Sequence, residues 1–197
     1  MPPSRDDLAD LTLEPERYLL NEDPILRRIA VTSLDRSAAA RNAVVIARLA
    51  TDTNDAVRTA AAERLGWCGS SATEALDRMR GDLVPAVREA VATAYGELGH
   101  AGAIQWLVEA ANSDEDRQVR EASVAALGAI GSDDAIEPLL DLISGGPPQV
   151  RRRAIAAITV FDDARIEPAI RRAALDRNPG VREAAEMVVG RQIVEAG

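Results

Sequence analysis

The chain has few of the residues that usually build catalytic or metal sites. Its 197 residues include one cysteine, Cys68, and one histidine, His100. An internal disulfide or a metal site of clustered thiolate and imidazole ligands is therefore excluded. A P-loop, a nucleophile elbow and a dinucleotide-binding glycine pattern are also missing. We expect a protein that is not an enzyme and that holds no cofactor and no metal ion.

Aromatic residues make up only 3% of the chain, and lysine is absent, so all 23 basic side chains are arginine. With 47% hydrophobic residues the chain should still fold around a core of Ala, Leu, Ile and Val. The net charge of −9 disfavours nucleic acid as a partner. The sequence has neither a long uncharged apolar run nor the basic-then-apolar order of a signal peptide. We therefore expect a cytoplasmic protein without membrane contact.

What the chain does have is an internal repeat. An aliphatic residue followed by arginine recurs at steps of 30 to 32 residues, and we number the repeats one to six from these pairs: Leu26-Arg27, Val57-Arg58, Val87-Arg88, Val119-Arg120, Val150-Arg151 and Val181-Arg182. A period of this length is typical of units that bury their apolar faces only by stacking on their neighbours.

Each repeat has the pattern of two helices. In residues 117–146 an apolar stripe starts at Val119, Gly131 ends the first helix, and a second stripe starts at Ile136 and ends before Gly145. Nine residues after the leading aliphatic residue, four repeats carry a glycine, which suggests close backbone contact at Gly66, Gly96, Gly128 and Gly190. The pattern predicts an all-α fold, a right-handed α-α superhelix (α-solenoid) of about six helix pairs. We place it in one domain over residues 13–197, after a loose tail of residues 1–12.

The repeated arginines predict a structural ladder. An acidic residue stands a few positions before most of them, at Asp23, Asp55, Asp82, Asp116 and Asp176, where it would pair with the arginine or cap the helix. Repeat five begins with Gly-Gly-Pro-Pro-Gln instead, so Arg151 is expected to lack a partner.

The order D-x-x-V-R-x-x-A-x-x-x-L-G-x-[IL]-G, followed by A-I-x-P-L, resembles the HEAT repeat. The similarity is to its short, roughly 31-residue bacterial and archaeal type, also called phycobilisome-lyase HEAT-like, and covers residues 14–197. The resemblance implies that the helix with the aliphatic-arginine pair lines a concave groove whose exposed positions bind a protein or peptide. By register these positions are Arg28, Thr32, Arg36, Thr59, Glu63, Trp67, Glu89, Thr93, Glu97, Gln118, Glu121, Gln149, Arg152, Arg153, Glu183, Met187 and Arg191.

Two features of this groove have alternative interpretations. Trp67 is either an aromatic anchor for a partner or a cover for the end of a helix next to Cys68. The arginine-rich region around Arg151, Arg152 and Arg153, with Arg171 and Arg172 on the next helix, either receives an acidic segment or is a solvated surface.

The preferred function is a non-catalytic scaffold or adaptor for another protein or peptide. The resemblance leaves a first alternative, in which the protein is a subunit of a bilin lyase of the phycobilisome type or a chaperone of a small-molecule ligand. A second alternative is a HEAT-like DNA glycosylase, which the acidic net charge disfavours. If Ile193 and Val194 are exposed, a weak homodimer through that end is also expected.

Overall fold

The computed structural model describes residues 10–195, with side chains up to Gly190, and the elements described there are α-helices and 3-10 turns. The chain divides into two compact units, Met1–Leu98 and Gly99–Gly197. The prediction of an all-α repeat fold is confirmed. The tail expected over residues 1–12 lies outside the described residues up to position 9, while residues 10–13 are helical and Leu11 is buried.

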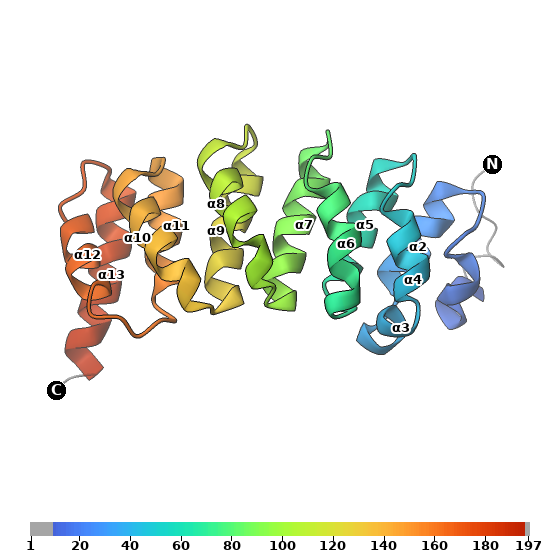
Figure 1. The fold of residues 1–197 in the computed structure, drawn as a ribbon, viewed down its shortest axis with the longest axis horizontal. Helices are drawn as coiled ribbons and strands as arrows, with labels where there is room; N and C mark the ends of the chain where they lie inside the picture. The colour runs from blue at the N-terminus through green and yellow to red at the C-terminus, as the bar shows by residue number, and fades with distance from the viewer. Residues whose placement is uncertain (1–9, 196–197) are drawn as a thin grey trace. The chain divides into compact units, whose positions relative to one another are not determined.

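In unit 1 the helices that carry the aliphatic-arginine pairs, here called leading helices, are α2, α5 and α7 (Figure 1). Helix α5 packs against both α2 and α7, and shorter helices pack behind this layer. The elements of unit 1 are η1 (Pro15–Tyr18), α2 (Pro24–Ser33), α3 (Arg36–Arg41), α4 (Ala43–Leu49), α5 (Asp55–Leu65), η2 (Ser70–Ala72), α6 (Thr73–Met79) and α7 (Pro85–Leu98).

In unit 2 the leading helices are α9, α11 and α13, and α11 packs between the other two. Helix α10 packs against α11 and α12, which gives the expected two layers. The elements of unit 2 are η3 (Ala101–Ala103), α8 (Ile104–Ser113), α9 (Arg117–Ile130), η4 (Asp133–Ala135), α10 (Ile136–Gly145), α11 (Pro148–Ile158), α12 (Ile166–Ala173) and α13 (Pro179–Glu195).

The apolar stripes form the core of each unit. In repeat two, Val57, Ala61 and Leu65 recur every fourth residue on α5, and all three are fully buried. Burying one such Val or Leu side chain stabilises the fold by about 1.5–3 kcal/mol. In repeat four the buried polar residue Ser123 occupies the middle position, and its hydroxyl donates to the Val119 carbonyl at 2.8 Å. The periodic core predicted from the sequence is therefore confirmed.

Glycines mark the closest approaches between leading helices. A Cβ added at Gly66 would lie 3.0 Å from the Cα of Ala94 on α7, and one at Gly128 would lie 2.8 Å from the Ala157 carbonyl oxygen on α11. Close backbone contact at these two glycines is thus confirmed, whereas the same expectation was wrong for Gly190, whose Cβ position has no atom within 4 Å. Gly131 ends α9 with a φ of 66°, as its place after the apolar stripe predicted.

An arginine ladder connects neighbouring leading helices within each unit. The Nε and Nη2 groups of one arginine donate to both carboxylate oxygens of an aspartate 24 or 25 residues later, at 2.7–3.0 Å. The pairs are Arg27 with Asp52, Arg58 with Asp82, and Arg151 with Asp176. This two-pronged geometry suits guanidinium and carboxylate groups and is among the stronger ion-pair arrangements.

The sequence-based assignment of these pairs to single repeats was wrong. The arginine extends from the start of its helix toward the turn of the next repeat, so it meets that repeat's aspartate. The acids nearer to it serve their own helix instead: Asp23 accepts from the Ile25 amide, and Asp116 accepts from the Gln118 and Val119 amides.

Each ladder aspartate also holds its own turn together. The Asp82 carboxylate accepts from the Val84 amide at 2.9 Å, and its carbonyl accepts from Nη1 of Arg88 at 2.7 Å. The hydrogen bonds from Arg58, together with that of the Val84 amide, outweigh partial burial and hold the pKa of Asp82 below its usual value. One aspartate thus links two helices and shapes the turn between them.

The ladder is interrupted between repeats four and five, and the arginine that loses its aspartate is Arg120 of repeat four rather than Arg151 of repeat five. Arg151 is buried and paired with Asp176, so the expectation that it lacks a partner was wrong. Gly145 stands five residues before Val150, where the ladder repeats carry aspartate five residues before the leading aliphatic residue. The Nε of Arg120, the arginine that would use an acid there, is buried without a hydrogen-bond partner. Its Nη1 donates only to the carbonyls of Asp114 and Glu115.

Candidate functional site

A hollow opens on the face of unit 1 formed by α2, α5 and the start of α7. Its volume is about 340 Å³. Four residues that the sequence assigned to a groove, Arg28, Thr32, Thr59 and Glu63, lie together in its lining. The remaining lining residues are Asp55, Ala56, Ala60, Val84 and Ala86. The hollow has a small-residue floor with charged side chains at its edges, which is a surface suited to contact with another chain.

Beside this hollow, Arg36, Trp67 and Glu97 form a row across three successive repeats. The Arg36 guanidinium carbon lies 5.0 Å from the centroid of the Trp67 ring. On the other side, Glu97 Oε2 lies 2.8 Å from the position that a Cβ would take at Gly66, the residue before Trp67. We call these three residues the charge row. Helix α2 ends at Ser33 and α5 at Leu65, so Arg36 begins α3 and Trp67 follows α5 rather than lying on the leading helices.

Trp67 lies against two arginines. The guanidinium carbon of Arg64 is 4.3 Å from its ring centroid, closer than that of Arg36. Such contacts contribute about 0.5–1 kcal/mol at exposed sites and restrict the guanidinium planes. The Arg64 Nη2 donates to the Thr32 carbonyl at 2.7 Å, whereas Arg64 Nε and Trp67 Nε1 are buried without partners. Cys68 contributes little chemistry here, because burial raises the pKa of its thiol.

Opposite charges separate along this face of unit 1. Arg28 and Arg36 lie at its first repeat and are exposed, and neither makes an ion pair among the described residues. Glu89 and Glu97 lie at the third repeat, half-exposed and exposed respectively, and are likewise unpaired within the described part. Between them, Glu63 approaches Arg64 at 3.6 Å. Thr93, the remaining predicted residue of this unit, is exposed on α7.

In unit 2 the predicted residues are spread over the leading helices. Glu121 on α9 is held by Arg117 at 2.7 Å. Arg152 and Arg153 on α11 are exposed and form no ion pair in the described part of the chain, in contrast to buried Arg151. The others are exposed or half-exposed: Gln118, Gln149, Glu183 and Met187. The side chain of Arg191 lies outside the described residues, as do those of Ile193 and Val194. Partner binding at these positions stays a prediction.

The arginine-rich region proposed from the sequence does not act as one patch. Arg151 belongs to the ladder, and Arg171 pairs with Glu167 one turn earlier on α12. Arg172 lines a different surface, described next. The exposed arginines of α11 that are free for a partner are therefore Arg152 and Arg153.

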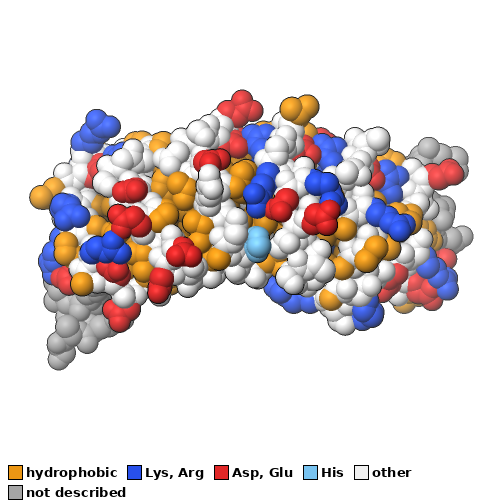
Figure 2. All heavy atoms as spheres, viewed as in Figure 1, with side chains coloured by type: hydrophobic (Ala, Val, Ile, Leu, Met, Phe, Trp, Pro, Cys, Tyr) orange, Lys and Arg blue, Asp and Glu red, His pale blue; other side chains and the backbone are white. Residues whose placement is uncertain are grey.

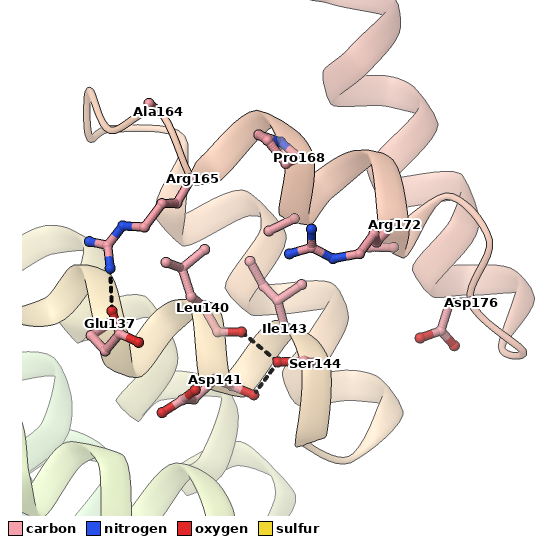
Figure 3. Close-up of a pocket in the computed structure, with 12 residues that line it drawn as sticks. Glu137, Leu140, Asp141, Ile143, Ser144, Ala164, Arg165, Pro168, Arg172 and Asp176 are labelled. Atoms are coloured by element: carbon pink, nitrogen blue, oxygen red, sulfur yellow. Dashed lines mark hydrogen bonds and ion pairs between the residues drawn. The ribbon is translucent and has the colours of Figure 1, made fainter.

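The sequence reasoning missed a larger pocket of about 630 Å³ between α10 and α12 (Figure 3). Leu140 and Ile143 point into it from α10, and Arg172 extends over them from α12. At one end Arg165 forms an ion pair with Glu137, and Arg165 also holds the pKa of Asp163 low, at about 2. No signal in the sequence marks this pocket, because Leu140 falls on the same apolar stripe as Ile136 and Leu139, and only the structure shows it half-exposed.

Neither site has the chemistry of a metal centre. Within residues 10–195 no three His, Cys, Asp or Glu side chains are arranged to hold a metal ion.

Acidic and basic side chains alternate with apolar ones over the face shown in Figure 2. None of the described helices combines the length and apolar character needed to cross a membrane.

Comparisons with solved structures agree with this architecture. The complex of CpcE and CpcF of phycocyanin lyase from Nostoc sp. PCC7120 has a TM-score of 0.65 at 22% identity, covering 88% of this chain and 74% of that one. A designed armadillo repeat protein in complex with the peptide (KR)4 has a TM-score of 0.62 at 16% identity, covering 92% and 98%. YibA of E. coli has a TM-score of 0.60 at 22% identity, covering 94% and 74%. At these identities the likeness concerns the fold alone.

The sequence itself decides the family. None of the curated proteins compared with the chain matches it. A family model of HEAT repeats matches residues 72–147 and 136–193, which together make up more than half of the chain. This match, together with the stacked helix pairs and the periodic core, shows that the protein belongs to the HEAT-repeat family.

Proposed function

We propose that this protein is a binding scaffold that holds another protein or a peptide on the exposed face of its leading helices. The observation that carries the proposal is the hollow of unit 1, which gathers Arg28, Thr32, Thr59 and Glu63 from two neighbouring leading helices. Charged side chains at the edge of the hollow, among them the unpaired Arg28, surround a floor of small residues and give the polar rim and apolar centre common in protein interfaces.

The similarity to a designed repeat protein in complex with a peptide supports the same proposal. In solenoids each repeat contributes one strip of the surface, so an extended chain can contact several repeats at once. A scaffold of this kind needs no catalytic group.

The test is quantitative affinity capture from a lysate of the source cells. We would compare the native chain with two face variants, Trp67→Ala in unit 1 and Arg152→Glu with Arg153→Glu in unit 2. The control variant, Arg171→Glu with Arg172→Glu, makes the same charge change on α12. We expect a defined protein to be captured by the native chain and by the control, and lost with at least one face variant. Capture that all variants retain, or that only the control loses, contradicts the proposal.

A second candidate is a subunit of a bilin lyase, favoured by the similarity to the CpcE and CpcF complex. Arg152 and Arg153 are exposed and free to meet the propionate groups of a tetrapyrrole. Mixing the protein with a bilin would then shift the absorbance band of the bilin, and Arg152→Glu with Arg153→Glu would remove the shift. An unchanged spectrum dismisses this candidate.

A further inference from the structure

The charge row of unit 1 leaves unlike charges without partners at its two ends. Arg36 and Glu97 are both exposed, and the structure gives neither an ion pair among the described residues. They are two repeats apart. Since packed helices lie about 8–10 Å from each other, the backbones at these two residues are roughly 16–20 Å apart, and the two side chains form no ion pair with each other.

The Arg36 end has the features of a carboxylate site. Trp67 lies against both Arg36 and Arg64, with guanidinium carbons 5.0 and 4.3 Å from its ring centroid. Stacking leaves the N–H edge of a guanidinium available for two parallel hydrogen bonds to a carboxylate. Arg28 is a further exposed arginine of the same repeat. Glu63, 3.6 Å from Arg64, offsets part of this positive charge, as do Asp35 next to Arg36 and Asp55 in the lining of the hollow.

The Glu97 end has the opposite character. Glu97 and Glu89 both lie on α7, and the described part of the chain provides no arginine in contact with either carboxylate. The two residues are separated by about 12 Å along the helix axis, so each carboxylate can take a basic side chain of its own. Trp67 lies between the two ends, and the hollow beside the row offers Ala56, Ala60 and Ala86, which suit small or aliphatic side chains.

Building on the proposed function, we propose that unit 1 binds an extended peptide segment with segregated charges, its acidic end on Arg36 and its basic end on Glu97 and Glu89. An extended chain advances about 3.3 Å per residue, so a segment that spans the backbones at Arg36 and Glu97 is about five or six residues long. Trp67 is a positioning residue that orients Arg36. A uniformly basic segment is disfavoured, because its first charges would face Arg28 and Arg36.

The probe is an acetylated and amidated peptide of two aspartates, four apolar residues and two arginines. The matched probe has the same composition with one aspartate and one arginine at each end. The protein is the full chain carrying Trp106→Phe, which leaves Trp67 as its only tryptophan. Trp67 fluorescence and titration calorimetry report binding. We expect the segregated peptide to bind at least tenfold more tightly than the mixed one.

Variants then assign the ends. Arg36→Glu should weaken the segregated peptide at least tenfold, whereas Arg48→Glu, an equal charge change on α4, should stay within twofold. The double variant Arg36→Glu with Glu97→Arg should regain affinity, because the same peptide fits in the reverse direction. Circular dichroism confirms that each variant is folded.

Equal affinity for the two peptides, or equal losses with Arg36→Glu and Arg48→Glu, would overturn the charge-row inference. If a protein is still captured in the lysate experiment and lost with the face variants, the scaffold proposal survives that failure. Self-association of the chain that competes with the peptide would assign the row to a second copy and would also overturn the inference.

Discussion

Arg120 is the residue at which the arginine ladder stops. Its Nε is buried and unpaired, and a Cβ added at Gly145 has no atom within 4 Å. We predict that Gly145→Asp supplies the missing carboxylate and raises the free energy of unfolding by about 1 kcal/mol. Urea denaturation of the native chain, Gly145→Asp and Gly145→Asn measures this. Gly145→Asn, which lacks the charge, should not give this increase in stability. The increase for Gly145→Asp should also vanish when Arg120 is changed to Gln, and an increase that persists there has another cause.

A substitution at Gly128 tests how closely α9 and α11 approach each other. A methyl group there would lie 2.8 Å from the Ala157 carbonyl oxygen, so Gly128→Ala should destabilise the protein by about 1–3 kcal/mol. Gly190 has open space around its Cβ position, and Gly190→Ala should stabilise by about 0.5–1 kcal/mol because alanine favours the helix. Thermal unfolding of both variants gives shifts of opposite sign. Equal shifts would show that helix propensity alone governs these positions.

At the scale of the elements, Asp82 joins α5 to the turn before α7. Asp82→Asn should lower the free energy of unfolding by about 2 kcal/mol, since a half-buried arginine loses its carboxylate. Asp55→Asn is the matched control: Asp55 is exposed, and its carboxylate accepts from the neighbouring Ala56 amide. Chemical denaturation of the two variants distinguishes pairing of Arg58 with Asp82 from pairing with Asp55. A larger loss of unfolding free energy for Asp55→Asn would favour the pairing within one repeat.

Most elements were predictable because their signals are local. The stripe from Val119 and the stop at Gly131 specify α9 without reference to any other helix. The break between α2 and α3 at Leu34 and Asp35 was missed, since only the structure shows that Asp35 caps a new helix by accepting from the Ala38 amide. The ladder was misassigned for a related reason: chain distance placed Asp55 near Arg58, while stacking brings Asp82 to it.

The candidate site was predictable only in part. Repeat register identified the positions that lie around the hollow of unit 1, because equivalent positions share a face. The pocket between α10 and α12 was not predicted, since it depends on how far Leu140 and Arg172 extend between two helices. Such spacing is a property of packing and leaves no periodic signal in the sequence.

For the whole molecule, the ladder makes stability depend on pH. Hydrogen bonds from Arg58 and Arg151 hold the pKa values of Asp82 and Asp176 below that of an unfolded aspartate, about 3.9. Their contribution is therefore complete above about pH 5 and is lost as the pH falls through the lowered folded values. We expect the free energy of unfolding to decline between about pH 5 and pH 2. Urea denaturation across this range should show a smaller decline for Asp82→Asn; an equal decline would assign the acid sensitivity to other carboxylates.

Because each ladder arginine pairs with the following repeat, the array can lose one repeat and still join correctly. Removal of residues 145–175 takes out Gly145 and connects Ser144 to Asp176. Arg120 would then be followed, at the usual spacing, by Asp176, the aspartate that pairs in the intact chain with Arg151, which this deletion removes. A gene that shortens by one period at this place would therefore yield a chain with a more continuous ladder than its parent, whereas a slightly longer or shorter deletion would not leave Asp176 at the ladder spacing from Arg120.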